Sequence, residues 1–152
     1  MANLAKIEKL LVQLQLDFKL IELKEAVYSI DAKAESIGID KNEVVKTLVV
    51  RTNNGFIALA LCGNDRVNFK KVRARFGNKC ELASADEVLE QVKVPIGVVC
   101  PILIEVPLFV DKKVLKLGRI HMGSGDLMHG LEMKKDDLFK AIDIFELADF
   151  SV

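Results

Sequence analysis

Apolar residues near the start of the chain recur at a helical spacing and then change to a strand-like alternation. A helix is predicted from Asn3, a suitable N-cap, and its apolar stripe is Leu4, Ile7, Leu10, Leu11 and Leu14. From Phe18 to Leu23 apolar and charged residues largely alternate, which predicts a strand. Ser29 and Gly38 suit the two ends of a second helix at about 30–37. The chain is therefore predicted to open as helix, strand, helix.

The next apolar run, Leu48-Val49-Val50, predicts a buried strand. Before it, the segment from Asp40 to Glu43 has the sequence pattern of a capping box, which predicts a short helical turn. Lys46 therefore lies where this turn meets a core strand. Its ammonium could reach water at the rim or point into a pocket, and position alone favours the solvated rim because most lysines are solvated.

Turn and cap signals predict an irregular order of helices and strands in the remainder of the chain. Asn53-Asn54-Gly55 predicts a hairpin, because these residues tolerate positive φ angles. The other predicted helices lie between the cap Asn68 and Gly77, from the capping box at Ser84 to about Gln91, and at about Lys135 to Ile142, before a short tail. The other predicted strands are 56–62, short core strands within Pro95 to Val110, 119–122 and 130–133. This mixture predicts an α+β fold with a mixed sheet.

Composition narrows the class of protein. The chain has 152 residues, 51% hydrophobic and 29% charged, which fits one globular domain over residues 1–152. Its formal net charge is zero, which argues against nonspecific coating of nucleic acid but leaves room for a local basic face. The three cysteines form no CxxC pair, so free thiols in a reducing cytosol are expected, and neither a metal site nor a cofactor is predicted. No signal peptide or membrane helix is predicted either.

Two glycine-containing segments are candidates for chemistry. In Gly97-Val98-Val99-Cys100-Pro101, backbone N–H groups could hold a carbonyl or an oxyanion, although an ordinary turn between core strands explains the pattern as well. Cys100 is expected to pack rather than to act as a nucleophile. Gly123-Ser124-Gly125 resembles a phosphate loop in glycine content but lacks its lysine, so a hairpin loop is the simpler interpretation. His129 follows, and a structural histidine is the simpler interpretation there.

A cluster of bases follows the second predicted hairpin strand. On a helix, the apolar residues between these bases would face the core, and the bases would form an exposed ridge. That ridge is either a solvated face or a binding surface for phosphates. We name this set the basic cluster, and its members are Arg66, Lys70, Lys71, Arg73 and Arg75. No acidic pair or Ser/His/Asp set is placed convincingly for acid–base or nucleophilic catalysis.

Taken in order, these segments resemble the YbaK/ProX family of aminoacyl-tRNA deacylases, which also occurs as an editing insertion in bacterial prolyl-tRNA synthetases. The resemblance is carried by 45–50 around Lys46, by Gly63-Asn64-Asp65-Arg66-Val67-Asn68, by Gly97 to Pro101, by Val110-Asp111, and by Gly123-Ser124-Gly125 with His129. It spans nearly the whole chain. The sequence departs from the common pattern at Cys100-Pro101-Ile102, where many relatives have Ser before the proline and Phe or Gly after it.

The resemblance implies a curved mixed sheet that forms a barrel-like core flanked by helices. It implies catalytic roles for Lys46 and for the loop residues Gly97, Cys100 and Pro101. Substrate-binding residues are implied at Thr47, Asp111, Gly123, Ser124 and His129. The expected activity is hydrolysis of the ester bond of mischarged tRNA, with tRNA(Pro) carrying Ala or Cys as the substrate.

The partners implied are the acceptor end of a charged tRNA and a prolyl-tRNA synthetase, in the cytoplasm. Two alternatives remain open on the sequence. One is a module of the same fold that binds tRNA or a synthetase without hydrolysis. The other is a nucleotide-binding domain that uses Gly123 to Gly125, and it lacks supporting phosphate ligands.

Overall fold

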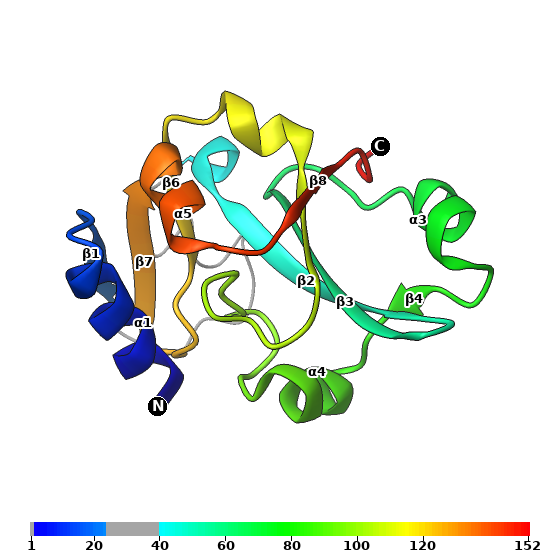
Figure 1. Cartoon of the computed structure of the whole chain (residues 1–152), viewed down its shortest axis with the longest axis horizontal. Helices are drawn as coiled ribbons and strands as arrows, with labels where there is room; N and C mark the ends of the chain where they lie inside the picture. Colours follow the sequence, from blue (N-terminus) through cyan, green and yellow to red (C-terminus); the bar gives the residue numbers. More distant parts are fainter. Residues whose placement is uncertain (1, 24–39) are drawn as a thin grey trace.

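The structure, a computed structural model, describes residues 2–23 and 40–152 and has an α+β architecture built on two sheets (Figure 1). The helices are α1 Ala2–Gln13, α3 Phe69–Phe76, α4 Ala85–Val92 and α5 Lys135–Ala141, with 3₁₀ turns η1 Lys41–Glu43 and η2 Lys112–Lys116. The strands are β1 Lys19–Glu22, β2 Val45–Thr52, β3 Gly55–Cys62, β4 Glu81–Leu82, β5 Leu108–Asp111, β6 Arg119–Gly123, β7 His129–Lys134 and β8 Glu146–Ala148. The predicted fold class is confirmed.

The two sheets differ in strand direction. One is antiparallel, with the order β1-β7-β6. The other is mixed, with the order β4-β2-β3-β5-β8, and β5 lies parallel to both β3 and β8. A bridge between Val44 and His121 connects the start of β2 to β6. Over the described residues the sheets therefore meet without closing into one barrel, which refines the predicted barrel-like core.

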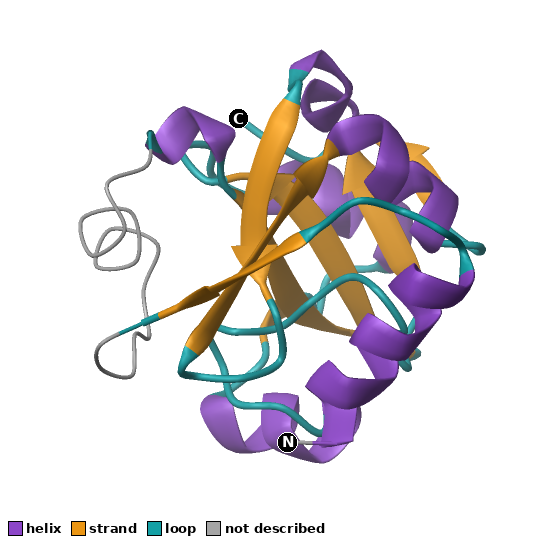
Figure 2. Cartoon of the chain, turned by 90° about the vertical axis from the view of Figure 1, so that its left-hand side faces the viewer, coloured by secondary structure: helices purple, strands orange, loops and turns teal. Residues whose placement is uncertain are grey.

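Apolar side chains cover both faces of the five-stranded sheet. Ile57, Leu59 and Leu61 of β3 pack in one cluster with α3 and the C-terminal segment. Ala58 and Ala60, on the other face of β3, pack in a cluster that also contains buried side chains of α1, β6, β7 and α5. Figure 1 shows these latter elements on the left and α3 on the right, and Figure 2 views the molecule from that left-hand side. β2 and β3 are thus the central strands, and they position the residues discussed below.

Local cap and turn chemistry explains the elements that the sequence predicted well. Asn68 caps α3, and its side chain accepts hydrogen bonds from the N–H groups of residues 70 and 71. Ser84 and Glu87 form the predicted capping box at α4. The β2–β3 hairpin turns at Asn53-Asn54, and Gly55 has a φ of 125°, which favours glycine there.

Other expectations were wrong or lie outside the described residues. The apolar stretch from Pro95 to Val110 forms β5 alone rather than several strands, because its glycine and prolines break the backbone ladder, although many of its apolar side chains are buried. α1 begins at Ala2, so Asn3 lies within the helix rather than at its cap. The predicted tail contains β8, and the helix predicted at about 30–37 lies outside the described residues.

Candidate functional site

A cavity of about 300 Å³ lies beside the first half of β2. It is lined by Val44 to Val49 of β2, by Leu82, Ala83 and Val88, and by Ile96, Gly97, Val99 and Gly123. Four of the predicted site residues therefore meet here, namely Lys46, Thr47, Gly97 and Gly123. The cavity lining does not include Cys100, Pro101, Asp111, Ser124 or His129.

The ammonium of Lys46 is held by backbone carbonyls. Lys46 is the second residue of β2 and is half-buried, and its Nζ donates to the carbonyl oxygens of Gly63 (3.3 Å) and Asp65. Both acceptors lie in the loop after β3, which Gly63 also ties to β2 by donating its N–H to the carbonyl of Val44 (2.7 Å). The cation is therefore fixed at the end of the β2–β3 hairpin, at the edge of the cavity.

Thr47 contributes a buried hydroxyl. Its side chain is 8% exposed, and its Oγ1 has no hydrogen-bond partner among the described residues. Because side chains alternate along a strand, Thr47 shares its face of β2 with Val45 and Val49, opposite the face of Lys46. Val49 packs against cavity-lining residues of the β4–α4 region and Val99, so Thr47 faces the same space.

The loop from Gly97 to Pro101 divides between the cavity and the core. Gly97 has a φ of 91°, a conformation that favours glycine, in a turn closed by a hydrogen bond from the Val98 N–H to the Pro95 carbonyl (3.4 Å). The N–H groups of Gly97 and Val99 donate to no group among the described residues, whereas both residues line the cavity. They are the candidates for holding a carbonyl oxygen.

The second half of this loop, Cys100 and Pro101, lies outside the cavity lining. The Cys100 side chain is 4% exposed and packs in the large core cluster, in keeping with its expected packing role. Pro101 lines a separate cavity between α1 and the segment that follows α5. The structure thus brings Gly97 to the site and leaves Cys100 and Pro101 as supports of the loop.

Gly123 allows the β6–β7 turn to touch the Gly97 loop. A Cβ at this position would lie 2.6 Å from the carbonyl carbon and oxygen of Val98 and 2.8 Å from the oxygen of Val99. The Gly125 N–H also donates to the Val98 carbonyl (2.8 Å). The β6–β7 turn therefore holds the backbone of 98–99 in place against β2. The glycine content of this turn predicts a hairpin loop, and the resemblance implies substrate binding at Gly123, but neither predicts this close backbone approach.

Ser124 and His129 hold the turn itself together. The Ser124 hydroxyl is buried, donates to the His129 carbonyl (2.7 Å) and accepts from the Asp126 N–H (3.2 Å). His129 Nδ1 lies 3.5 Å from Asp126 Oδ1. The N–H of Met128, with His129, lowers the pKa of the Asp126 carboxyl. In this structure both predicted residues serve the turn rather than the cavity wall.

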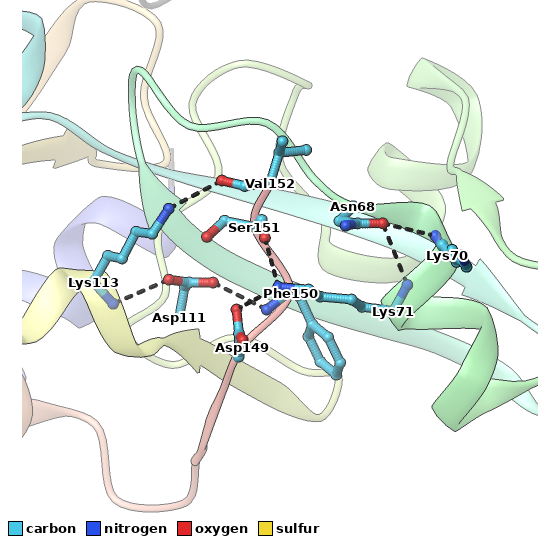
Figure 3. Close-up of polar contacts among 9 residues, drawn as sticks. All are labelled: Asn68, Lys70, Lys71, Asp111, Lys113, Asp149, Phe150, Ser151 and Val152. Atoms are coloured by element: carbon cyan, nitrogen blue, oxygen red, sulfur yellow. Dashed lines mark hydrogen bonds and ion pairs between the residues drawn. The ribbon is translucent and has the colours of Figure 1, made fainter.

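Asp111 binds the C-terminal segment, as Figure 3 shows. Its carboxylate is 5% exposed and accepts hydrogen bonds from the N–H groups of Lys113 (3.0 Å) and Phe150 (3.1 Å). The Lys113 ammonium donates in turn to the Val152 carbonyl (3.0 Å). These contacts assign Asp111 a structural position away from the cavity.

Much of the basic cluster is occupied by contacts within the protein. Arg75 pairs with Glu146 and lies over aromatic rings, with its guanidinium carbon 5.0 Å from the ring centre of Phe109. Arg73 donates to the Cys80 carbonyl (3.2 Å) and lies over the Phe69 ring. Both guanidinium groups therefore stabilise the surface on which they lie.

The other three members of the basic cluster differ in their partners. Lys71 binds Asp149 (3.0 Å) and the Ser151 carbonyl (3.1 Å), and this contact lowers the pKa of Asp149. Arg66 and Lys70 are exposed, and their side chains form no hydrogen bond or ion pair with a described residue. Arg66 directly follows Asp65, whose carbonyl accepts from Lys46, and Lys70 lies at the start of α3.

The described residues, 2–23 and 40–152, contain no group of three or more His, Cys, Asp or Glu side chains placed to hold a metal ion. Among these residues no helix is both long enough and apolar enough to cross a membrane.

Comparison with known proteins places these features in a family. Residues 24–141 match the family described as the aminoacyl-tRNA editing domain. The chain is 35% identical over 80 residues to proline–tRNA ligase of Pseudothermotoga lettingae, a match that covers 52% of this chain and 14% of the ligase. It is 33% identical over 81 residues to the uncharacterised protein YwhH of Bacillus subtilis, covering 53% of this chain and 52% of that protein.

Solved structures share the fold. A structure described as "hypothetical protein APE2540" superposes with a TM-score of 0.85 at 28% identity, covering 97% of this chain and 99% of that one. Another, described as "a putative trans-editing enzyme for prolyl tRNA synthetase", gives a TM-score of 0.82 at 20% identity, covering 100% and 98%. The fold of the chain is therefore that of these two proteins.

Proposed function

This chain belongs to the aminoacyl-tRNA editing domain family, and we propose that it is a trans-editing deacylase that hydrolyses the ester bond of a mischarged tRNA. The proposed substrate is tRNA(Pro) carrying a small wrong amino acid such as Ala or Cys. We propose further that residues 1–152 act as one editing domain in the cytoplasm, with a prolyl-tRNA synthetase as a possible partner. The similarity to proline–tRNA ligases supports the choice of tRNA.

One observation carries the proposal. A fixed cation, Lys46, and two backbone donors, the N–H groups of Gly97 and Val99, meet at the edge and wall of one cavity. A cation can bind the phosphate or ribose oxygens of the tRNA end, and N–H groups can polarise an ester carbonyl. The same cavity is lined mainly by apolar side chains, which suit a small aminoacyl group.

The proposed chemistry is attack of water on the ester carbonyl. A bond forms between the water oxygen and the carbonyl carbon, and the ester bond to the terminal ribose then breaks as the ribose oxygen takes a proton. Lys46 anchors the terminal adenosine, and the donors of the Gly97 loop stabilise the oxyanion, where losing one donor typically costs about 10²–10³ in rate. Among residues 2–23 and 40–152 the cavity lining supplies no carboxylate or histidine as a base, and we propose that the substrate's own 2′-OH, or the thiol of Cys, assists the attack.

Editing of this kind compensates for the limited selectivity of synthetase pockets against smaller amino acids. A pocket built for proline gains only about 1–3 kcal/mol of discrimination from a methylene or two, so smaller amino acids are not strongly rejected. A second pocket that admits the smaller residue and excludes proline can sort in the opposite direction.

The tRNA-binding surface is proposed to centre on Arg66 and Lys70. These side chains are exposed, whereas Lys71, Arg73 and Arg75 have partners within the protein. Charge reversal of Arg66 and Lys70 is expected to weaken tRNA binding and to reduce its dependence on salt. Lys140→Glu, at an exposed position on α5, is the matched control and should change neither.

Deacylation of a panel of mischarged tRNAs tests the proposal. Lys46→Ala should lose most of the turnover on Ala-tRNA(Pro) and Cys-tRNA(Pro), while Lys140→Ala should not. Because Lys46 also holds the loop after β3, circular dichroism and the Tm must show that Lys46→Ala is folded. A folded Lys46→Ala variant that is as fast as the parent would remove the central claim.

The competing function is a module that binds tRNA or a synthetase without hydrolysis. Two observations favour it: no carboxylate or histidine lines the cavity within the part of the chain that the structure describes, and the Lys46 ammonium already binds two carbonyls. Binding of tRNA without turnover on any member of the panel would establish it.

A further inference from the structure

The segment that follows β8 places one exposed carboxylate among lysines of two separate elements. Lys71 of α3 donates to Asp149 Oδ1 (3.0 Å), as Figure 3 shows. Lys112 and Lys113 belong to η2. The hydrogen bond from Lys71 lowers the pKa of the Asp149 carboxyl, and the charges of Lys113 and Lys112 lower it further. Cations from α3 and η2 therefore act on the same carboxylate.

The positive surface extends to both sides of this carboxylate. Arg66 and Lys70 are exposed on the side of α3, and Lys112 and Lys116 are exposed on the side of η2. The side chains of these residues form no hydrogen bond or ion pair with a described residue. Val152 connects the two sides, since its N–H donates to the Arg66 carbonyl (2.9 Å) and its carbonyl accepts from a lysine of η2 (3.0 Å). We name this surface the α3–η2 face, and its bases are Arg66, Lys70, Lys71, Lys112, Lys113 and Lys116.

The α3–η2 face begins at the loop that fixes Lys46. The Lys46 ammonium donates to the Asp65 carbonyl, and Arg66 is the next residue along the chain. An acceptor end bound at Lys46 can therefore continue across this face. Exposed lysine and arginine side chains are the groups that most often contact nucleic-acid phosphates, so the face has the chemistry that the stem of a tRNA requires.

We propose that the α3–η2 face binds the phosphate backbone of the acceptor stem, and that Asp149 occupies a phosphate position on it until RNA displaces this carboxylate. The inference rests on the proposed function and names the surface that holds the stem. The displacement is easy, because the side chains of Lys71 and Asp149 are 41% and 62% exposed and exposed ion pairs contribute little to stability. A phosphate offers Lys71 an equivalent charged acceptor. Removing the Asp149 charge should therefore strengthen RNA binding.

Binding of uncharged tRNA(Pro) to the full chain, measured by fluorescence anisotropy at physiological salt, tests the proposal. The Kd of Asp149→Asn should fall about threefold, the factor expected when one exposed ion pair no longer competes. Asp143→Asn is the matched control, because it removes an exposed carboxylate away from the face, and salt screening confines its effect to nearby charges. Its Kd should equal that of the parent. Lys112→Gln should raise the Kd and lower the slope of log Kd against log salt by about one, whereas Lys140→Gln should change neither.

Two features of the design keep the inference separate from hydrolysis and from folding. Uncharged tRNA has no ester, so these measurements stand whether or not the chain is a deacylase. The Lys112 side chain has no hydrogen bond or ion pair with a described residue, so Lys112→Gln tests the face even if the Tm shows Asp149→Asn to be unstable. A hairpin RNA that copies the acceptor stem should show the same gain with Asp149→Asn as the whole tRNA. Equal Kd values for the two Asn variants, a gain that is lost with the hairpin, or an unchanged salt slope in Lys112→Gln would each overturn the inference.

Discussion

Replacing Gly123 by alanine is expected to impair the site by displacing the backbone of the Gly97 loop. The new Cβ would lie 2.6 Å from the carbonyl carbon and oxygen of Val98 and 2.8 Å from the oxygen of Val99, whereas ordinary contacts begin near 3.4 Å. The atoms in the way are backbone rather than the flexible end of a side chain. The segment from Val98 to Val99 must therefore retreat from β6 by about 1 Å, a displacement that can cost about 10²-fold in rate when it moves a catalytic group.

The same displacement has a cost in stability. It lengthens the hydrogen bond from the Gly125 N–H to the Val98 carbonyl, now 2.8 Å, and it disturbs the packing of Val99 against Val49. Overpacking of this kind typically costs about 1–3 kcal/mol, so Gly123→Ala should still fold. Its kcat should fall by about 10²-fold, because in the proposed mechanism the displaced N–H groups of the Gly97 loop act on the reacting carbonyl.

Gly118→Ala is the matched control, because a Cβ at Gly118 would meet nothing within 4 Å. Deacylation of mischarged tRNA(Pro) is measured for both variants and the parent, with urea denaturation to report the free energy of unfolding. Gly118→Ala should stay close to the parent in both measurements. If folded Gly123→Ala turns over within twofold of Gly118→Ala, the position of the 97–99 backbone does not govern catalysis.

Three other outcomes are expected. Asp111→Ala should lower the free energy of unfolding in urea by about 1–3 kcal/mol, because two backbone N–H groups lose a buried acceptor, and a specific loss of kcat in the folded variant would contradict its structural role. Burial, together with nearby carboxylates, raises the pKa of the Cys62 thiol, so alkylation followed by mass spectrometry should need a higher pH than free cysteine, and fast reaction at neutral pH would refute this. Ser84→Ala removes the N-cap of α4 and should cost about 1 kcal/mol by thermal denaturation, whereas an unchanged Tm would show that the cap is dispensable.

The parts of the fold that the sequence predicted well depend on local chemistry. Asn68, Ser84 and the Asn53-Asn54 turn satisfy backbone groups within three residues of themselves, so their patterns are visible without the fold. β8 has no such signal. Its pairing is with β5, more than thirty positions earlier, and two of its three residues are exposed. Only the folded chain brings those two segments together.

The apolar stretch after Pro95 shows a second limit of predicting strands from the sequence. Val98, Val99, Cys100 and Ile102 are all buried, as in a core strand, yet none of them belongs to one. Burial alone does not distinguish a strand from an irregular loop whose carbonyls are bound by a neighbouring turn, as Gly125 binds Val98. That contact is between segments distant in sequence, so the role of Gly123 could not be predicted.

The geometry of β2 also explains why adjacent residues can serve different ends of one substrate. Successive side chains of a strand point to opposite faces, so Lys46 and Thr47 are separated by the strand itself although their Cα atoms are only about 3.8 Å apart. Lys46 reaches the carbonyls of Gly63 and Asp65 at the open end of the hairpin, whereas the Thr47 side chain lies on the other face of β2, with its Oγ1 buried. The proposed substrate also has two different ends, because its ester joins the charged end of a tRNA to a small amino acid. In the proposed function, the alternation that begins at the start of β2 therefore puts the Lys46 ammonium and the Thr47 side chain on opposite faces of one strand.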